Sequence, residues 1–468
     1  MGAGGTTQPM FGSDDPLAVA LEAVVRVVWL AAVLAWSVAV FAVRNPLMFV
    51  GIGAPIALSI WGGPWHALLL VAGMVVALTL WRILAAASFM RRVRPRLATG
   101  WRGPFYRLIW PRLARRHRLI AYEARGGRGD GEVPKLCRVR ITSSGIERLL
   151  LRLPAGLTPD DVAGACDGLA HAFRCVDARV APASPGRVWL ELHRRDSLAA
   201  VVTPILQPGS VDLGRLPVGR HEDGKEWSMR LSGTHVLIAG ATGSGKGSIL
   251  WSLFRALAPA IESGHVAMWV VDPKGGMELR PGIALFARFE DGTTDSMCEL
   301  LEELVQLKDE RARELASEAR RVHEPTPASP HIVLVIDELA TLTAFAERSI
   351  VRRIDQALGL LLTQGRACGI TVVAAVQDPG KDVVGWRDLF PTRVAMRLDN
   401  PIQVDMVLGE GARDRGARSD QISELTPGVA FVRVEGTREL RRVRASYLDD
   451  QAIERLACSV TPPVGEAA

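Results

Sequence analysis

The residues best suited to chemistry stand at 240–248, where the sequence reads GATGSGKGS. They follow a short apolar run, 235–239, of the kind that forms a central parallel strand. Glycines in this pattern allow a tight turn whose backbone N–H groups face inward at the start of a helix, predicted from about 246 to 258. Such a turn binds phosphate groups, and the helix dipole adds to the attraction. The predicted phosphate loop consists of Gly240, Ala241, Thr242, Gly243, Ser244, Gly245, Lys246, Gly247 and Ser248.

The end of this loop decides which ligands it can hold. Lys246 would place its ammonium on the β- and γ-phosphates of a nucleotide, which we expect to be ATP with Mg²⁺. The usual pattern then asks for Ser or Thr, whose hydroxyl binds the metal, but this chain has Gly247. Ser248 lies about 100° further around the helix and cannot simply take its place. Either water replaces the hydroxyl, or the loop has an unusual register.

An acidic pair, Asp337 and Glu338, follows a second apolar run, Ile332–Ile336, about ninety residues after the phosphate loop. The carboxyl end of a buried parallel strand is where α/β sheets bind ligands. There Asp337 can hold Mg²⁺ through water, and Glu338 can polarise an attacking water as general base. The competing interpretation is a buried strand with a solvated acidic end.

Two more apolar runs complete the expected sheet. Met268–Val271 leads into Asp272-Pro-Lys274, and Ile370–Val376 ends at Gln377, which would either sense the γ-phosphate or cap its strand. A charged helix with an apolar stripe is expected over 299–322, on the outside of the sheet. The pattern predicts an α/β fold with a RecA-like P-loop ATPase domain.

The N-terminal region contains three apolar runs: Val27–Val43, Leu47–Trp61 and Ala67–Trp81. A membrane-spanning helix needs about 20 apolar residues, so each run is short. We expect an N-terminal transmembrane helical hairpin of two spans, with three as the alternative, because the middle run is interrupted by Gly and Pro. Arginines after the last run mark that side as cytoplasmic. A signal peptide and a buried helical hairpin are the competing interpretations.

Composition sets wider limits. The 468 residues carry 56 Lys plus Arg against 50 Asp plus Glu, a formal charge of +6. That excess suits a polyanionic partner, or arginines that flank a membrane segment. Six cysteines show no CxxC or zinc-site spacing, so reduced thiols are expected.

The chain divides into six parts by composition and pattern. A helix that opens with a Thr158 cap and several short strands indicate a small α+β domain before the ATPase domain. The expected parts are a disordered cytoplasmic N-terminus (1–26), a transmembrane region (27–82), a basic juxtamembrane connector (83–130), the small α+β domain (131–200), the ATPase domain (201–450) and a short tail (451–468).

Together these motifs resemble the FtsK/SpoIIIE family of hexameric double-stranded DNA translocases. The resemblance covers about 205–450 and rests on motifs in the family's order: GATGSGKG, VVDPKGGMEL (270–279), VLVIDELATL (333–342), GRACGITVVAAVQDP (365–379), PTRVAMRL (391–398) and LTPGVAFVRV (425–434). The two-span form and the lack of room for a winged-helix domain after 450 resemble the Tra proteins of actinobacterial integrative conjugative elements, which move double-stranded DNA between cells.

The resemblance implies a membrane-anchored, multi-pass protein with a cytoplasmic ATPase domain that acts as a hexameric ring on double-stranded DNA. Lys246, Asp337 and Glu338 would carry ATP hydrolysis, and Gln377 would contact the nucleotide. Arg393 is the first candidate for the finger that reaches a neighbour's γ-phosphate, and Arg366 is the second. Asp378 stands where the family often has arginine, so only Gln377 is carried over from that motif.

Three other functions stay open. A chromosome-segregation translocase at the division septum shares all of these motifs. A type VII protein-secretion ATPase shares the fold and the spans but usually has several ATPase modules in tandem. A nucleotide-regulated scaffold without hydrolysis is supported by Gly247 alone, and the intact Asp337 and Glu338 oppose it.

Overall fold

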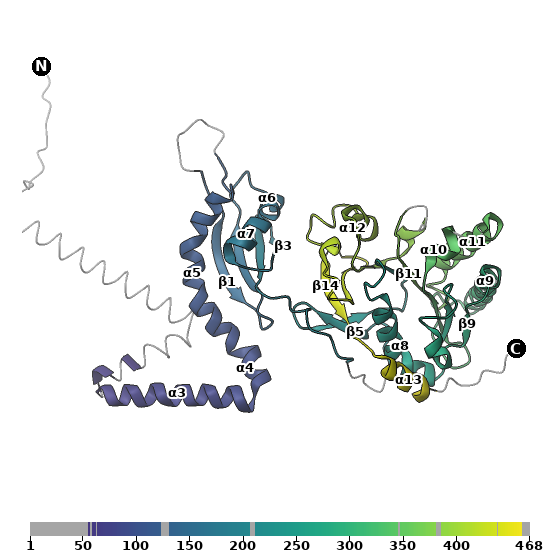
Figure 1. The fold of residues 1–468 in the computed structure, drawn as a ribbon, viewed down its shortest axis with the longest axis horizontal. Coiled ribbons are helices and arrows are strands. Elements are labelled where there is room, and N and C mark those ends of the chain that lie inside the picture. Colours follow the sequence, from purple (N-terminus) through teal and green to yellow (C-terminus); the bar gives the residue numbers. More distant parts are fainter. Residues whose placement is uncertain are drawn as a thin grey trace, which may run out of the picture.

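The computed structural model describes residues 55–56, 59–61, 63–122, 131–205, 211–344, 347–380, 385–437 and 439–460. Figure 1 shows three parts in chain order: a set of helices, a small domain and a larger domain built on a wide sheet. The run Val27–Val43 and most of Leu47–Trp61 lie outside the described residues.

The helical part consists of α3 (Pro64–Leu84), α4 (Ala86–Arg92) and α5 (Arg94–Arg116). Among the described residues, α3 is the one helix long and apolar enough to cross a membrane, and none of its apolar window is buried in the protein. It contains the run Ala67–Trp81, which is therefore helical as expected. The predicted helical hairpin is not confirmed, because one candidate span is described.

The small domain is a four-stranded antiparallel sheet in the order β1-β2-β4-β3, with helices on one face. Thr158 and Asp161 form a reciprocal capping box at the predicted helix start. That helix is divided in two near Ala165. Its elements are β1 (Lys135–Ile141), β2 (Glu147–Arg152), α6 (Pro159–Gly164), α7 (Cys166–Phe173), β3 (Asp177–Ser184) and β4 (Arg187–His193).

A buried carboxylate joins three segments of this domain. Glu147 has no exposed surface and accepts hydrogen bonds from Arg102 and Tyr106 of α5. It also pairs at 2.8 Å with Nε of Arg194, which begins the connection to the larger domain. Helix, sheet and connection therefore meet at one side chain.

The larger domain is a mixed sheet, ten strands wide within the described residues, in the order β6-β5-β14-β13-β12-β7-β11-β10-β8-β9. Strands β12 to β9 of that order are parallel, and the other four are antiparallel. The strands are β5 (Leu216–His221), β6 (Glu226–Met229), β7 (Val236–Ala239), β8 (Val266–Val271), β9 (Arg288–Glu290), β10 (His331–Ile336), β11 (Ile370–Val376), β12 (Thr392–Ala395), β13 (Val429–Arg433) and β14 (Leu440–Ala445).

Helices cover both faces of this sheet, which explains its continuous apolar strands. Alternate residues point to opposite cores: Leu237 packs under α9, α11 and α12, whereas Ile238 packs under α8 and α13. The helices are α8 (Lys246–Glu262), α9 (Thr294–Ser317), α10 (Leu339–Ala344), α11 (Arg348–Gln364), α12 (Pro401–Leu408) and α13 (Asp450–Ser459), with the short turns η1 (Arg280–Leu285), η2 (Arg387–Leu389) and η3 (Ser419–Gln421). The charged helix predicted over 299–322 is α9.

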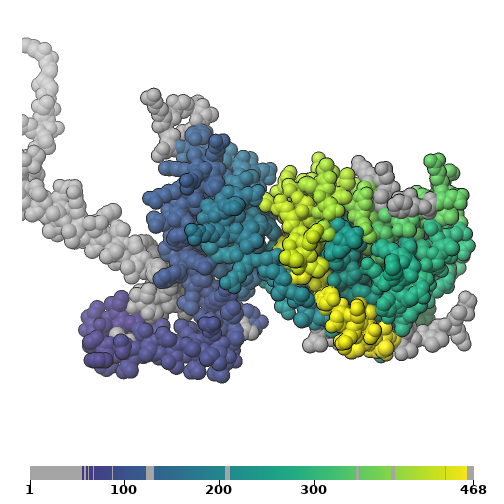
Figure 2. All heavy atoms as spheres, in the orientation of Figure 1, coloured from purple at the N-terminus to yellow at the C-terminus, as the bar shows by residue number. Residues whose placement is uncertain are grey.

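The two domains are in contact, as the space-filling view shows (Figure 2). Arg179 on β3 pairs with Glu222 at 3.0 Å, beside the turn that follows β5. Its guanidinium also lies over the ring of Phe431 on β13, 5.3 Å from the centroid. A second pair joins Arg418 to Asp167 at 2.7 Å.

Candidate active site

The phosphate loop lies between β7 and α8, as predicted. Gly243 and Gly245 both have positive backbone φ angles, +74° and +93°, which residues other than glycine rarely adopt. The loop is closed by the turn before β13, where the Gly428 N–H donates to the Ser244 carbonyl at 2.8 Å. A Cβ on Gly245 would lie 2.4 Å from the Gly428 nitrogen. The LTPG segment thus packs directly on the loop, a contact that sequence reasoning did not predict.

Lys246 is held inside this loop. Its Nζ donates to the Gly240 carbonyl at 2.8 Å, and 8% of the residue is exposed. Burial lowers the pKa of this ammonium, and the Glu338 carboxylate acts in the opposite direction. A buried cation with a single carbonyl partner is well placed to exchange that carbonyl for phosphate oxygens.

Asp337 and Glu338 lie at the carboxyl end of β10, next to the loop. Asp337 Oδ2 accepts from Lys274 Nζ at 2.8 Å, and Glu338 Oε1 accepts from the Gln377 backbone N–H at 3.1 Å. Both residues are buried, and Asp337 Oδ1 and Glu338 Oε2 have no hydrogen-bond partner among the described residues. Buried unpaired oxygens of this kind indicate a ligand or water, and carboxylates are the donors that Mg²⁺ prefers. These residues therefore fit Mg²⁺ held beside a nucleotide.

Lys274 also belongs to the site. The sequence motif contains it, but the sequence alone did not predict a role for it. Burial alone would lower its pKa, but the ion pair with Asp337 outweighs burial and the pKa is raised. Asp272 shapes its turn, because one carboxylate oxygen accepts from the Lys274 N–H at 3.0 Å. The signal that could have revealed it is position: Lys274 follows β8, the strand beside β10.

Gln377 connects the loop with the acidic pair. Its side-chain oxygen accepts from Thr242 Oγ1 at 2.8 Å, while its backbone N–H holds Glu338. Arg397, which sequence reasoning missed as a site residue, donates from Nη2 to the Thr242 carbonyl at 2.7 Å. The ends of β7, β10, β11 and β12 thus converge on one constellation.

The space beside Gly247 is lined by a further carboxylate. A Cβ on Gly247 would lie 3.4 Å from Glu278 Oε2. Burial raises the pKa of Glu278, and the Asp337 charge adds to the effect. The backbone N–H of Ser248 donates a hydrogen bond to the Gly245 carbonyl.

The two finger candidates lie together at the other end of the strands. Arg393 pairs in register with Leu237 on β7, and its guanidinium bonds to the Phe390 and Val407 carbonyls and to Asp388. Arg366 is more exposed and pairs only loosely, at 3.6 Å, with Glu435. Both line a cavity of about 430 Å³ together with Arg433. The structure does not bring them to this chain's own phosphate loop.

Comparison with protein families gives two matches. Residues 114–194 match the actinomycete conjugal transfer protein N-terminal domain, and residues 208–328 match the FtsK/SpoIIIE family. The first covers the end of α5 and the small domain. The second covers the phosphate loop and the Lys274 turn, and the same sheet continues beyond it to Asp337 and Glu338.

Individual relatives agree with the FtsK/SpoIIIE match. The DNA translocase FtsK of Treponema pallidum is 24% identical over 67% of this chain and 44% of its own length, and that of Bacillus anthracis is 24% identical over 64% and 40%. The chain spans less than half the length of these curated relatives.

Solved structures are also similar. The pCW3 conjugation coupling protein TcpA, solved with ATPγS, is 19% identical with a TM-score of 0.49, over 76% of this chain and 98% of that one. The type VII secretion ATPase EccC of Thermomonospora curvata is 20% identical with a TM-score of 0.46, over 57% of this chain and 35% of that one. The family matches and the geometry agree: the chain is an ATPase whose residues 208–328 are similar to the FtsK/SpoIIIE family and whose residues 114–194 are similar to the actinomycete conjugal transfer protein N-terminal domain.

Proposed function

We propose that this protein is a membrane-anchored motor that uses ATP hydrolysis to translocate double-stranded DNA during conjugal transfer of a mobile element. The observation that carries the proposal is the acidic pair of β10 beside the phosphate loop. Asp337 Oδ1 is buried without a partner among the described residues, and Glu338 Oε2 has no hydrogen bond there and lies 3.8 Å from Lys274 Nζ. The N-terminal domain match supports conjugation as the setting, because that domain is described from conjugal transfer proteins.

Each side chain has a distinct role in the proposed hydrolysis. The loop N–H groups and Lys246 bind the β- and γ-phosphates. Asp337 would hold Mg²⁺ through water, and the bound ion would neutralise charge on the phosphate oxygens. Glu338 accepts a proton from the attacking water, and Gln377 positions Glu338 through its backbone N–H. Lys274 holds Oδ2 of Asp337, so its ammonium would repel an ion held at Oδ1, and nucleotide binding would weaken this ion pair.

We place the protein in a homo-hexameric ring. In this arrangement Arg366 or Arg393 would approach the γ-phosphate on the neighbouring subunit. Arg366 needs less rearrangement, since its one ion pair is long, whereas Arg393 would have to release two carbonyls. The single variants Arg366→Ala and Arg393→Ala distinguish the two candidates. Replacing the true finger should abolish DNA-stimulated turnover and leave nucleotide binding intact.

We place α3 in the cell membrane, with the ATPase domain on the cytoplasmic side. Arg82, in the last turn of α3, and the arginines of α4 supply the positive flank. A multi-pass arrangement adds spans before Pro64.

The central experiment measures ATP hydrolysis by the full chain in detergent, with and without duplex DNA. The Glu338→Gln variant should lose about a hundredfold to ten-thousandfold of the rate while still binding ATP, because the general base is gone. Glu299→Gln, on the exposed side of α9, is the matched control and should keep the wild-type rate.

Three outcomes would overturn parts of the proposal. Absence of ATP turnover in the wild-type chain with DNA and Mg²⁺ present would exclude a motor. Stimulation by a secreted protein in place of DNA would indicate export. Defective chromosome partitioning in a Glu338→Gln strain, with normal transfer between cells, would indicate segregation.

A further inference from the structure

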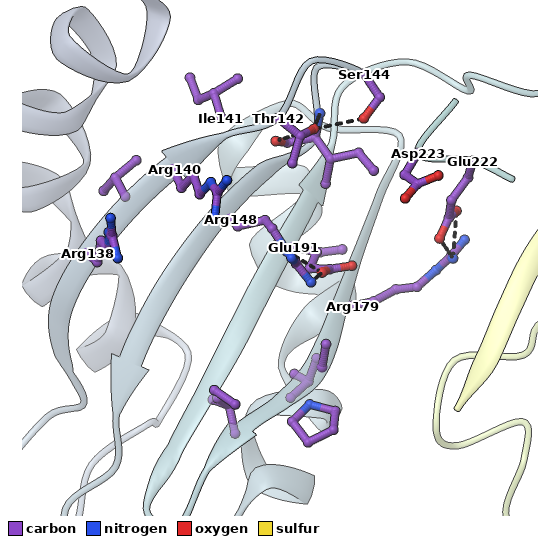
Figure 3. A pocket seen from close by; sticks show the side chains of 18 of the residues that line it. Arg138, Arg140, Ile141, Thr142, Ser144, Arg148, Arg179, Glu191, Glu222 and Asp223 are labelled. Carbon is purple, nitrogen blue, oxygen red and sulfur yellow. Dashed lines mark hydrogen bonds and ion pairs between the residues drawn. The ribbon is translucent and has the colours of Figure 1, made fainter. Parts of the chain in front are cut away.

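The small domain carries a row of basic side chains across the sheet face turned away from its core. Strand pairing sets Arg140 opposite Arg148, Arg148 opposite Glu191, and Glu191 opposite Arg179. The residues between them, such as Leu149 and Leu190, point into the core. Figure 3 shows Arg138, Arg140 and Arg148 side by side on this face.

Part of this row is neutralised and part is not. Arg148 bonds to Glu191 at 2.6 Å and lies over the Trp189 ring, while Arg179 pairs with Glu222. Arg138 and Arg140 are exposed, and neither has an ion-pair partner among the described residues. Arg140 and Arg148 lie directly opposite each other on neighbouring strands, and like charges in that position destabilise a sheet. A bound anion would remove that cost.

The row forms one wall of a groove of about 2800 Å³. The other walls are the end of α3 with α4 and α5 on one side and the larger domain on the other. Arg441 and Arg442 line the groove on the larger domain, where they pair with Glu439 and Asp196. Basic side chains outnumber acidic ones along it, and none of its described lining residues is Asn or Gln. The lining therefore offers contacts to phosphate and lacks the amide side chains that read adenine edges, and its arginines bind phosphate of any sequence when they contact the backbone.

We propose that this arginine groove, defined by Arg138, Arg140 and Arg148, binds the phosphate backbone of double-stranded DNA without sequence preference. The inference rests on the proposed function for its ligand, and it adds a second DNA contact outside the ATPase domain. A bilayer fits less well, because a flat membrane surface cannot enter a groove that has protein on both sides. A long polyanion can follow it from the helices to the larger domain.

The test measures binding of a fluorescent duplex to the full chain in neutral detergent at several salt concentrations. The Arg138→Ala/Arg140→Ala variant should bind roughly tenfold or more weakly, and the slope of log K against log salt should fall by about 2. Arg112→Ala/Arg152→Ala removes the same charge from exposed positions that do not line the groove, and should keep the wild-type slope. Basal ATP hydrolysis should match wild type in both variants.

The outcomes separate this inference from the proposed function. Failure of the wild-type chain to bind duplex would overturn both. Wild-type binding with an unchanged slope in the groove variant would overturn the groove alone. Loss of binding to anionic lipid vesicles, with duplex binding intact, would assign the groove to the membrane and also overturn it.

A separate observation concerns the metal ligand that Gly247 does not supply. Glu278 reaches the space that a Ser or Thr side chain would occupy, with Oε2 3.4 Å from the position of a Cβ on Gly247. No hydrogen bond or ion pair of the Glu278 side chain is present among the described residues. The buried oxygens Asp337 Oδ1 and Glu338 Oε2 also lack a hydrogen bond in this described part of the site.

We infer that Glu278 replaces the missing hydroxyl and helps to hold Mg²⁺ beside the nucleotide, directly or through water. Carboxylate oxygen is as suitable a donor as hydroxyl oxygen for this ion. The chain thus has a carboxylate, Glu278, next to the position where the usual motif has a hydroxyl, and Gly247 leaves room for it. This inference too rests on the proposed function for its ligand.

Mg²⁺ titration of fluorescent ATP-analogue binding tests it without any measurement of turnover. Glu278→Gln should raise the Mg²⁺ concentration needed for half-maximal enhancement by about tenfold. Gly247→Ser added to that variant should restore it, because the new hydroxyl has room beside residue 278. Unchanged Mg²⁺ dependence in Glu278→Gln would overturn the inference, whereas a wild-type chain that binds no nucleotide would overturn the ATPase site itself.

Discussion

At the scale of single residues, the decisive interaction is the ion pair between Lys274 and Asp337. Asp337 is fully buried, and without nucleotide its nearest compensating charge is the Lys274 ammonium, 2.8 Å away. A buried carboxylate that loses its partner keeps its desolvation penalty. The lysine therefore stabilises the nucleotide-free state, and it competes with the metal for the same carboxylate.

Replacing Lys274 by Met should separate these two effects. The nucleotide-free variant should be less stable by about 3 kcal/mol, because Asp337 is left buried and unpaired. Addition of Mg-ATP should stabilise the variant more than it stabilises wild type, since no ammonium then repels the ion at Asp337. Thermal melting with and without Mg-ATP measures both, with Lys135→Met on exposed β1 as control. Equal shifts on Mg-ATP addition would contradict the competition.

At the scale of elements, the phosphate loop depends on the turn that packs behind it. Gly245→Ala would place a methyl group 2.4 Å from the Gly428 nitrogen, in a backbone with φ of +93°. We expect loss of nucleotide binding and a stability decrease of more than about 2 kcal/mol, because the clash is with backbone and cannot relax by rotation.

The matched control is Gly359→Ala on α11, where a Cβ meets nothing within 4 Å. This change should leave nucleotide binding intact, and calorimetric titration with ATP compares the two variants directly. Normal ATP binding by the Gly245→Ala variant would show that the loop and the Gly428 turn move apart easily.

The parallel sheet also contains buried histidines that predict a pH dependence. His331 on β10 bonds through Nε2 to Thr371 Oγ1 at 3.0 Å, and burial lowers its pKa to about 4. The unfolded chain, with an ordinary histidine pKa near 6.5, binds a proton first as pH falls. Stability should therefore decrease between about pH 6.5 and 4, by up to about 3 kcal/mol for this residue.

His331→Gln should flatten that part of the stability curve, since glutamine does not titrate and its amide can still donate to Thr371. Chemical denaturation across this pH range measures the slope. His265→Gln, at an exposed position, should leave the slope as it is in wild type. A slope that is the same in the His331→Gln variant would assign the acid sensitivity to other groups.

The local sequence pattern predicted the strands of the site better than it predicted the contacts between segments that are distant in the sequence. Apolar runs ending in polar residues correctly gave β7, β8, β10 and β11, because a strand covered on both faces must be apolar throughout. Contacts such as Gly428 with Ser244 and Glu278 with Gly247 join segments 31 to 184 residues apart. Nothing in local spacing encodes such contacts. The structure of the basic connector could not be predicted either. Its helix α5 continues through Pro104 and Pro111 and packs on the small sheet.

At the scale of the whole molecule, Arg179 links the two domains. It pairs with Glu222 and lies over Phe431, both in the larger domain, and burial raises the pKa of Glu222 against the effect of Arg179. Arg179→Met should weaken the coupling by about 1.5 kcal/mol, because it leaves the half-buried Glu222 without this hydrogen-bonded cation.

Calorimetry should then resolve two unfolding transitions where wild type shows one. Limited proteolysis should also cut faster within the connection between β4 and β5. Arg195→Met, exposed in that same connection, controls for loss of charge alone. A single transition in the Arg179→Met variant would show that other contacts hold the domains together.

The buried Glu147 has a mechanical consequence. A motor that pulls on a polymer experiences an equal and opposite pull on its anchor. From the ATPase sheet that reaction force passes along the chain to Arg194, then through Glu147 to Arg102 and Tyr106 of α5, and so toward α3. The carboxylate is loaded sideways by two arginines that belong to opposite ends of this path. In the proposed membrane-anchored motor, Glu147 would therefore transmit the reaction force of each translocation step from the ATPase domain to the helices of the anchor.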